Sequence, residues 1–414
     1  MKQIISLLIA FLPLAVLAET FDFTSAKNPL PLYSDSIGYG YESVPEVKKG
    51  ISTPFFFSVK VPDGNYKVTL DVGSKKSQAN TTVRAENRRL MAENIATRKG
   101  ETKTVSFIVN KRNPRIDDKS SVSLKPREKS YLNWDNKLTV EITGEAPAVQ
   151  RITVEPADST VTTIYLCGNS TVVDHDKEPW ASWGQMIPRW FDDNIVISNH
   201  AESGLSTSTF LAHKRLDKIM TTLRPGDWVL VEFGHNDEKE KRPGSGAWYN
   251  FAHNLKIFVD RVRKAGGNIV FVTPTQRRNF LEDSVTIRDT HGDFPVAMKA
   301  VAAREGVPVI DLNRMTREFF ETLGYENSKR SLVHYPANTF PGQTDPLEDN
   351  THFNPYGAYE IAKMVVMGMK EAGLEPVKHL RSDFVDYDPC RPDSWEEFQW
   401  IPAAGADIVK PDGN

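Results

Sequence analysis

The sequence has little cysteine and no imbalance of charge. Only two of its 414 residues are Cys, and 51 Lys and Arg residues stand against 54 Asp and Glu residues, for a net charge of −3. No spacing of Cys and His residues matches a metal site, so we expect no bound metal of that type. Long runs of one charge are also missing, which argues against nucleic acid or an anionic membrane as the partner.

The two cysteines are Cys167 and Cys390. They can form at most one disulfide, and only in an oxidising compartment. Cys167 ends an expected buried strand, where a small buried residue fits. We therefore favour two free thiols.

Long hydrophobic segments are missing beyond the N-terminus. Residues 4–16 are apolar apart from Ser6 and Pro13, Lys2 precedes them, and residues 16–18 offer a cleavage site before Glu19. This pattern predicts a secretory signal peptide over residues 1–18. The apolar stretch is too short to span a bilayer, and no Cys follows it as a lipid attachment site. We expect a monomer without a membrane anchor, secreted or periplasmic in a bacterium.

Residues 19–158 have the two-residue periodicity of β-strands. Residues 55–61 and 66–72 alternate on either side of Pro62-Asp63-Gly64, which predicts a hairpin. Other period-two segments lie near residues 105–109, 138–142 and 152–154. Strands at this spacing without helical periodicity predict a sandwich of two sheets.

Residues 159–374 alternate between strand and helix patterns, the signature of a parallel α/β sheet. Strands are expected over residues 161–167, 195–197, 228–233, 269–272 and 307–310. Helices are expected near residues 183–191, 207–223, 248–265 and 295–305, from about residue 313, and over 355–372. Residues 375–414, rich in Pro, Asp and aromatic rings, predict an ordered strap packed on both domains.

The strand expected over residues 161–167 ends in Gly168, Asn169 and Ser170. Ligands bind at the carboxyl ends of the strands in an open parallel sheet, so Ser170 is a candidate nucleophile. The alternative is an ordinary tight turn in which Ser170 caps the next helix.

Asp349 and His352 lie three residues apart, in an expected turn before a helix that begins at Pro355. At that spacing Asp349 reaches one ring nitrogen of His352. The other nitrogen is then available to take the proton of a serine. The alternative is a helix-capping acid beside an unrelated histidine.

Three hydrogen-bond donors follow three of the expected strands. They are the N–H of Ser170, the N–H of Gly204 and the side-chain amide of Asn236. Because the carboxyl ends of parallel strands meet at one edge of the sheet, these donors should converge. Three converging donors are what a tetrahedral oxyanion needs.

Four sequence blocks, in this order, resemble those of the SGNH (GDSL-type) hydrolases. The blocks are Gly168-Asn169-Ser170, Gly204, Gly234-His235-Asn236-Asp237 and Asp349-Asn350-Thr351-His352. Further segments resemble the rhamnogalacturonan acetylesterase branch: Asn199-His200-Ala201, Ser206-Thr207, Thr273-Pro274, Arg277-Arg278 and Asp293-Phe294-Pro295. The resemblance covers about residues 162–372.

The resemblance implies a flavodoxin-like, three-layer αβα domain. It also implies Ser170 as nucleophile, His352 as base, Asp349 as the residue that orients it, and an oxyanion hole of Ser170, Gly204 and Asn236. The family usually has Asp at the position of Asn169, which bears on how the serine turn is hydrogen-bonded. The Gly-x-Ser-x-Gly elbow of α/β-hydrolases is absent around Ser170.

The N-terminal half resembles the galactose-binding-like β-sandwich modules attached to secreted carbohydrate enzymes. The resemblance rests on Phe21-Asp22-Phe23, on residues 39–42 and on the strand pattern. Such a module would bind sugar through exposed aromatic rings or would only shield the second domain.

The sequence therefore predicts an exported serine carbohydrate esterase that removes O-acetyl groups from pectic polysaccharide of the rhamnogalacturonan type. The expected partner is an acetylated plant polysaccharide or oligosaccharide, and no metal or organic cofactor is required. Arg277, Arg278 and His235 are candidate substrate-binding residues, with the arginines facing uronate carboxylates. The alternative is that the two arginines lie at the surface and only form ion pairs with neighbouring acidic residues. Two other functions stay open: an SGNH esterase or lipase acting on lipid or aryl esters, and an inactive carbohydrate-binding protein.

Overall fold

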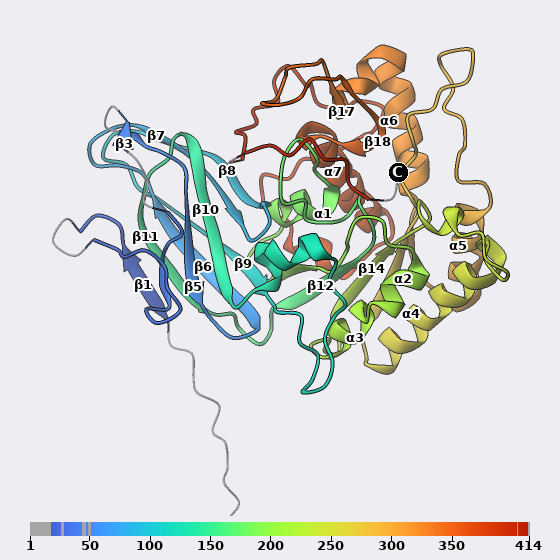
Figure 1. The fold of residues 1–414 in the computed structure, drawn as a ribbon, viewed down its shortest axis with the longest axis horizontal. Coiled ribbons are helices and arrows are strands. Elements are labelled where there is room, and N and C mark those ends of the chain that lie inside the picture. The colour runs from blue at the N-terminus through green and yellow to red at the C-terminus, as the bar shows by residue number, and fades with distance from the viewer. Residues whose placement is uncertain (1–17, 26–28, 44–46, 49–50, 404, 413–414) are drawn as a thin grey trace, which may run out of the picture.

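The computed structural model describes residues 18–25, 29–43, 47–48, 51–403 and 405–412. Antiparallel sheets make up the N-terminal half, and a parallel sheet covered by helices makes up the C-terminal half (Figure 1). Apart from Ala18, the predicted signal peptide lies outside the described residues. In the part that is described, no helix is both long enough and apolar enough to cross a membrane.

Two antiparallel sheets form the N-terminal half. One has the strand order β1 (Glu19–Asp22), β11 (Val149–Pro156), β6 (Gly64–Val72) and β9 (Lys103–Lys111). The other has the order β2 (Tyr39–Tyr41), β5 (Phe55–Lys60), β10 (Lys137–Ala146), β7 (Ala79–Ala85) and β8 (Arg89–Thr97). Outside them, β3 (Val47–Lys48) pairs with β4 (Ile51–Ser52), and the 3-10 helices η1 (Pro126–Ser130) and η2 (Leu132–Trp134) precede β10.

The predicted hairpin between residues 55–61 and 66–72 is wrong. Strand β5 pairs with β2 and β10, whereas β6 pairs with β11 and β9 in the other sheet. Each strand turns one apolar face to the same core, where Phe57 and Leu70 are both buried. Alternation therefore does not distinguish a hairpin from a connection that crosses between two packed sheets.

The parallel sheet of the C-terminal half confirms the predicted α/β fold. Its order is β13 (Ile195–Asn199), β12 (Thr162–Cys167), β14 (Trp228–Glu232), β15 (Asn268–Val272) and β16 (Val309–Ile310). In chain order this is 2-1-3-4-5, the flavodoxin-like arrangement. An antiparallel pair, β17 (Leu332–Tyr335) and β18 (Leu347–Phe353), stands outside the sheet and was not predicted.

Helices cover both faces of this sheet. One apolar core packs α1 (Trp183–Met186), η3 (Ile187–Trp190), α6 (Leu312–Asn327) and α7 (Pro355–Glu371) on one face. A second core packs α2 (Thr207–Ala212), α3 (Arg215–Met220), the π-helical turn η5 (Ala247–Phe251), α4 (Ala252–Lys264) and α5 (Phe294–Glu305) on the other. The remaining 3-10 helices are η4 (Asp237–Lys239), η6 (Ser328–Ser331) and η7 (Glu375–His379). Alternate residues of β12 supply the two cores, since Leu166 enters the first and Cys167 the second.

The single helix predicted over residues 207–223 is two helices. Lys214, between α2 and α3, has a φ of 62°, a left-handed conformation that an α-helix does not continue through. The break allows α3 to bring Arg215 to Glu128 of η1, 2.6 Å away, in an ion pair that is fully buried. Helical periodicity in the sequence carries no sign of this long-range contact.

Buried charges join the two halves of the chain. Arg89 of β8 donates from Nε to Oδ2 of Asp174 at 2.6 Å, and Asn199 of β13 donates to the other carboxylate oxygen at 2.7 Å. The C-terminal strap adds Trp400, which donates to Glu178 at 2.8 Å and lies against the Arg84 guanidinium, 4.6 Å from the ring centroid. The N-terminal half is therefore fastened to the loop that follows Ser170.

We predict that Arg89→Ala lowers the free energy of unfolding by about 3–5 kcal/mol, because it leaves the buried Asp174 carboxylate without its cation. Urea denaturation measures the change. Arg391→Ala is the control, since the Arg391 side chain is 88% exposed, and its effect should stay within about 0.5 kcal/mol. A loss below about 1 kcal/mol for Arg89→Ala would contradict the prediction.

Candidate active site

The serine turn begins directly at the end of β12. A Cβ on Gly168 would lie 2.5 Å from Cγ2 of Val172 and 3.1 Å from the Glu232 carbonyl oxygen, so only glycine fits there. The N–H groups of Val172 and Val173 both donate to the Asn169 carbonyl oxygen at 3.0 Å. This tight turn presents Ser170 at the carboxyl end of β12, with 4% of its surface exposed.

Asn169 keeps the serine turn hydrogen-bonded through its side-chain oxygen. That oxygen accepts the N–H of Thr171 at 3.1 Å. An asparagine and an aspartate both offer this acceptor, so the departure from the family pattern leaves the bond in place. The Thr171 hydroxyl also donates to Glu232 at 2.7 Å, and burial raises the pKa of the Glu232 carboxyl to about 7.

Ser170, His352 and Asp349 meet although the serine is 182 residues from the histidine. The His352 Nε2 atom lies 2.8 Å from Oγ of Ser170, and Nδ1 lies 2.7 Å from Oδ2 of Asp349. A carboxylate only accepts, so Nδ1 carries the proton and Nε2 is the acceptor for the serine O–H. The arrangement can remove a proton from the serine.

The electrostatics keep Asp349 ionised. Burial raises the pKa of its carboxyl, but the hydrogen bond and charge of His352 and the N–H groups of His352 and Thr351 outweigh burial. The pKa consequently lies well below its usual range. An ionised Asp349 stabilises the imidazolium that forms when His352 takes a proton.

The Asp349–His352 segment lies in a strand, β18, and not in the turn predicted for it. Leu332 of β17 pairs with Phe353 and His334 pairs with Glu348, so one residue of β17 stands opposite four of β18. The extra residues form a bulge, and Oδ1 of Asp349 accepts the N–H groups of Thr351 and His352 within it at 2.9 and 3.0 Å. Bulges re-aim side chains in this way next to active sites.

Gly204 and Asn236 also lie at this edge of the sheet. Gly204 has a φ of 76°, which favours glycine. Nδ2 of Asn236 donates to the Leu205 carbonyl oxygen at 3.1 Å, which fixes the amide and leaves its second N–H for a ligand. Asp237 holds the same loop, because its side chain accepts the N–H groups of Gly234 at 3.1 Å and Thr207 at 2.8 Å.

Sequence reasoning missed His175. Its Nε2 donates to the carbonyl oxygen of Ser170 at 2.8 Å, and its ring centroid lies 6.5 Å from that of His352. Burial, with a further contribution from His352, lowers the pKa of His175 to about 3. The ring is therefore neutral and steadies the serine backbone. The feature of the sequence that could have pointed to His175 is its position, five residues after the candidate nucleophile Ser170.

The two candidate substrate-binding arginines lie deeper than the rim position predicted for them. Arg277 is paired with Glu238 and donates to Thr290 at 3.0 Å, and its side chain is 17% exposed. The Arg278 guanidinium is buried, where it donates to Ser328 at 2.9 Å and to Asn350 at 3.2 Å. This geometry corrects the placement of Arg278 on the open rim, because its donors are used by Asn350 in the bulge of β18 and by Ser328 and Tyr325.

His235 is also buried, with 2% of its surface exposed. Its Nε2 lies 3.2 Å from Oγ1 of Thr275, and its ring packs edge-on against His291 with centroids 4.6 Å apart. Its side chain supports the loop that carries Asn236.

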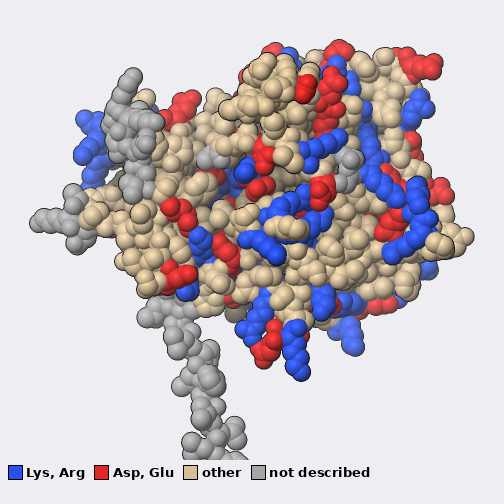
Figure 2. All heavy atoms as spheres, viewed as in Figure 1, with Lys and Arg blue, Asp and Glu red and all other residues tan. Residues whose placement is uncertain are grey.

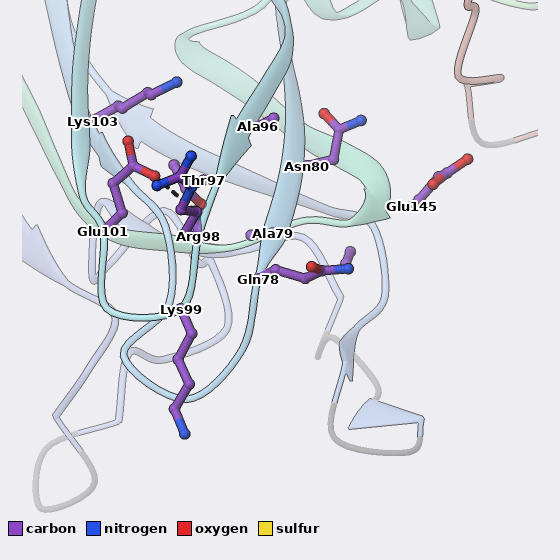
Figure 3. A pocket seen from close by; sticks show the side chains of 11 residues that line it. Gln78, Ala79, Asn80, Ala96, Thr97, Arg98, Lys99, Glu101, Lys103 and Glu145 are labelled. Atoms are coloured by element: carbon purple, nitrogen blue, oxygen red, sulfur yellow. Dashed lines mark hydrogen bonds between the residues drawn. The ribbon is translucent and has the colours of Figure 1, made fainter.

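A hollow of about 890 Å³ lies in the N-terminal half, away from these residues (Figure 3). It is lined by eleven residues of β7, β8, β9, β10 and adjoining loops, none aromatic and none a candidate site residue. The hollow therefore offers no ring on which a sugar would stack. Among the described residues, no group of three or more His, Cys, Asp and Glu side chains is arranged to hold a metal ion. Figure 2 shows acidic and basic side chains mixed across the visible face of both halves.

Comparison with known proteins gives concordant results. The GDSL-like lipase/acylhydrolase family matches residues 166–358. The rhamnogalacturonan acetylesterase RhgT of Bacillus subtilis is 42% identical over 221 residues, which are 53% of this chain and 94% of RhgT. The uncharacterized esterase YxiM of the same organism is 23% identical over 361 residues, which are 86% of this chain and 85% of YxiM.

The crystal structure of YxiM shares the fold. It superimposes with a TM-score of 0.50 and 22% identity, covering 87% of this chain and all of that structure (100%). The likeness therefore includes the antiparallel half as well as the α/β half.

We predict that Asp349→Asn weakens the loss of stability in acid. Since the folded-state pKa of Asp349 is depressed, its ionised form stabilises the fold above the ordinary value of 3.8, and this contribution is lost as the pH falls below it. The wild type should lose more free energy of unfolding between about pH 5 and about pH 3 than the variant does. Ser170→Ala keeps the His352–Asp349 pair and should follow the wild type. Equal losses in all three proteins would show that the pair does not govern this range.

Proposed function

The chain belongs to the GDSL-like lipase/acylhydrolase family and is a hydrolase related to rhamnogalacturonan acetylesterases, and on that premise we propose that it removes O-acetyl groups from rhamnogalacturonan-type pectic polysaccharide. The observation that carries the proposal is the 2.8 Å contact between His352 Nε2 and Ser170 Oγ, with Asp349 behind the ring at 2.7 Å. The choice of substrate is supported by the 42% identity to RhgT.

The reaction begins when His352 Nε2 takes the hydroxyl proton of Ser170 and Oγ bonds to the acetyl carbonyl carbon. The negative oxygen that results is stabilised by the N–H groups of Ser170 and Gly204 and the amide of Asn236. The bond from carbon to the sugar oxygen then breaks, and the imidazolium gives its proton to that oxygen. Water repeats both steps on the acetyl-serine and releases acetate.

The proton transfers in this mechanism need no group other than Ser170, His352 and Asp349. Asp349 stays ionised throughout and stabilises the imidazolium. His175 and Asn169 hold the serine turn, at 2.8 Å from the Ser170 carbonyl oxygen and 3.1 Å from the Thr171 N–H. Because the side chains of His175 and Asn169 are neutral and buried, the serine turn keeps its position while charge moves between His352 and the substrate.

We predict that the wild type releases acetate from acetylated rhamnogalacturonan and that Ser170→Ala and His352→Ala each lower kcat/KM by at least about 10³-fold. Acetate assay on a panel of acetylated plant polysaccharides measures this. Fluorophosphonate labelling of the wild type, absent in Ser170→Ala, would rule out an inactive carbohydrate-binding protein. Faster turnover of a long-chain p-nitrophenyl ester than of rhamnogalacturonan would instead favour a lipid or aryl esterase.

We also propose that the protein is exported after removal of residues 1–18. The support is the pattern of Lys2, the apolar residues 4–16 and the small residue Ala18. Strand β1 begins at Glu19, which pairs with Val154 of β11, so this cut leaves the first strand whole.

We predict that the mature protein begins at Glu19. N-terminal sequencing of the protein recovered from periplasm or medium checks the site. A protein retained in the cytoplasm with Met1 at its start would contradict export.

A further inference from the structure

Two cations from the N-terminal half hold one peptide of the candidate oxyanion hole. Nζ of Lys125 donates to the Ser203 carbonyl oxygen at 2.6 Å, and Nη2 of Arg127 donates to the same oxygen at 3.3 Å. Arg127 lies in η1 and Lys125 is its N-cap residue. Hydrogen bonds from charged donors are about twice as strong as neutral ones, so this carbonyl is firmly held.

The Ser203 carbonyl and the Gly204 N–H belong to one peptide unit. A trans peptide is planar, with its C=O and N–H pointing in opposite directions. Fixing the oxygen toward Lys125 therefore fixes the direction of the Gly204 N–H on the other side. A cation on the oxygen also polarises the peptide and makes its N–H a better donor.

We propose that Lys125 is a positioning residue of the oxyanion hole, which holds the Ser203–Gly204 peptide so that the Gly204 N–H faces the developing oxyanion. The inference rests on the proposed function, which assigns Gly204 to that hole. Lys125 acts through the peptide and does not touch the substrate.

Acidic groups hold Lys125 and Arg127 in place. Oδ2 of Asp412 lies 2.9 Å from Lys125 Nζ and 3.2 Å from Arg127 Nη2. Nε of Arg127 also donates to the buried Glu202 carboxylate at 3.0 Å, one residue before Ser203.

The space around Gly204 is correspondingly tight. A Cβ there would lie 2.9 Å from the Cβ of Asp412 and 3.1 Å from Nζ of Lys125. The ammonium group therefore stands directly against the peptide that it orients, and the site needs glycine for room as well as for its φ of 76°.

Steady-state hydrolysis of p-nitrophenyl acetate tests the proposal. Lys125→Met should lower kcat about ten- to hundredfold with KM changed less than about threefold, since losing a whole donor costs about 10²–10³-fold. Asn236→Ala removes a whole donor, so the fall in its kcat measures the largest loss expected. Lys125→Arg should recover most of the rate, because it restores a cation at the same place.

Lys129→Met is the matched control, since Lys129 is an exposed residue of the same short helix, and its kcat should equal that of the wild type. Inhibition by a boronic acid, which forms a tetrahedral adduct on the serine, should weaken in Lys125→Met by the same factor as kcat/KM. Lys125→Gln is the second neutral variant should the methionine variant not fold.

A folded Lys125→Met or Lys125→Gln protein with kcat within about twofold of the wild type would overturn the proposal. So would a rise in KM at constant kcat, which indicates a loss of ground-state binding alone. The two proposals fail separately. A wild type that hydrolyses p-nitrophenyl acetate but releases no acetate from rhamnogalacturonan refutes the substrate, while the Lys125 comparison is still decided on the small ester.

Discussion

The ionised carboxylate of Asp349 is the group on which the candidate site depends. It is 5% exposed, and its charge is balanced by three donors within 3.0 Å: Nδ1 of His352 and the N–H groups of His352 and Thr351. Those donors are brought together by the bulge in β18, and the bulge is held in turn by Arg278 through Asn350. A chain of buried polar contacts thus fixes which way the imidazole faces before any substrate binds.

The N-terminal half is part of the same construction. Arg89 fixes Asp174 after the serine turn, and Lys125 and Arg127 fix the peptide before Gly204. The Arg89–Asp174 pair is buried, and separating its partners would leave an uncompensated charge, which penalises other arrangements of the serine loop. The N-terminal half therefore acts on the loops of the α/β half directly, whether or not it contacts sugar.

The order of strands and helices and the members of the candidate triad could be predicted from sequence, whereas the strand pairing of the β-sheets and the contacts between the two halves could not. Strand-and-helix alternation predicts the parallel sheet, and the short blocks at Ser170, Gly204 and Asn236 follow strands of that sheet, where topology brings them together. The pairing of β5 with β10 was missed because a two-residue period is the same in either sheet. His175 and Lys125 were missed because each acts through a backbone carbonyl, which no side-chain motif records.

The path of the last residues has a practical consequence. Lys410 Nζ lies 4.0 Å from Oδ2 of Asp349 and Asp412 lies against Gly204, so the last described residues lie over the candidate site. A purification tag joined close after Asp412 would start near Asp349 and Gly204, where it would crowd a long glycan. Strand β1, which begins at Glu19 and pairs with β11 in an antiparallel sheet, is the better place to attach a tag, a dye or a surface linker.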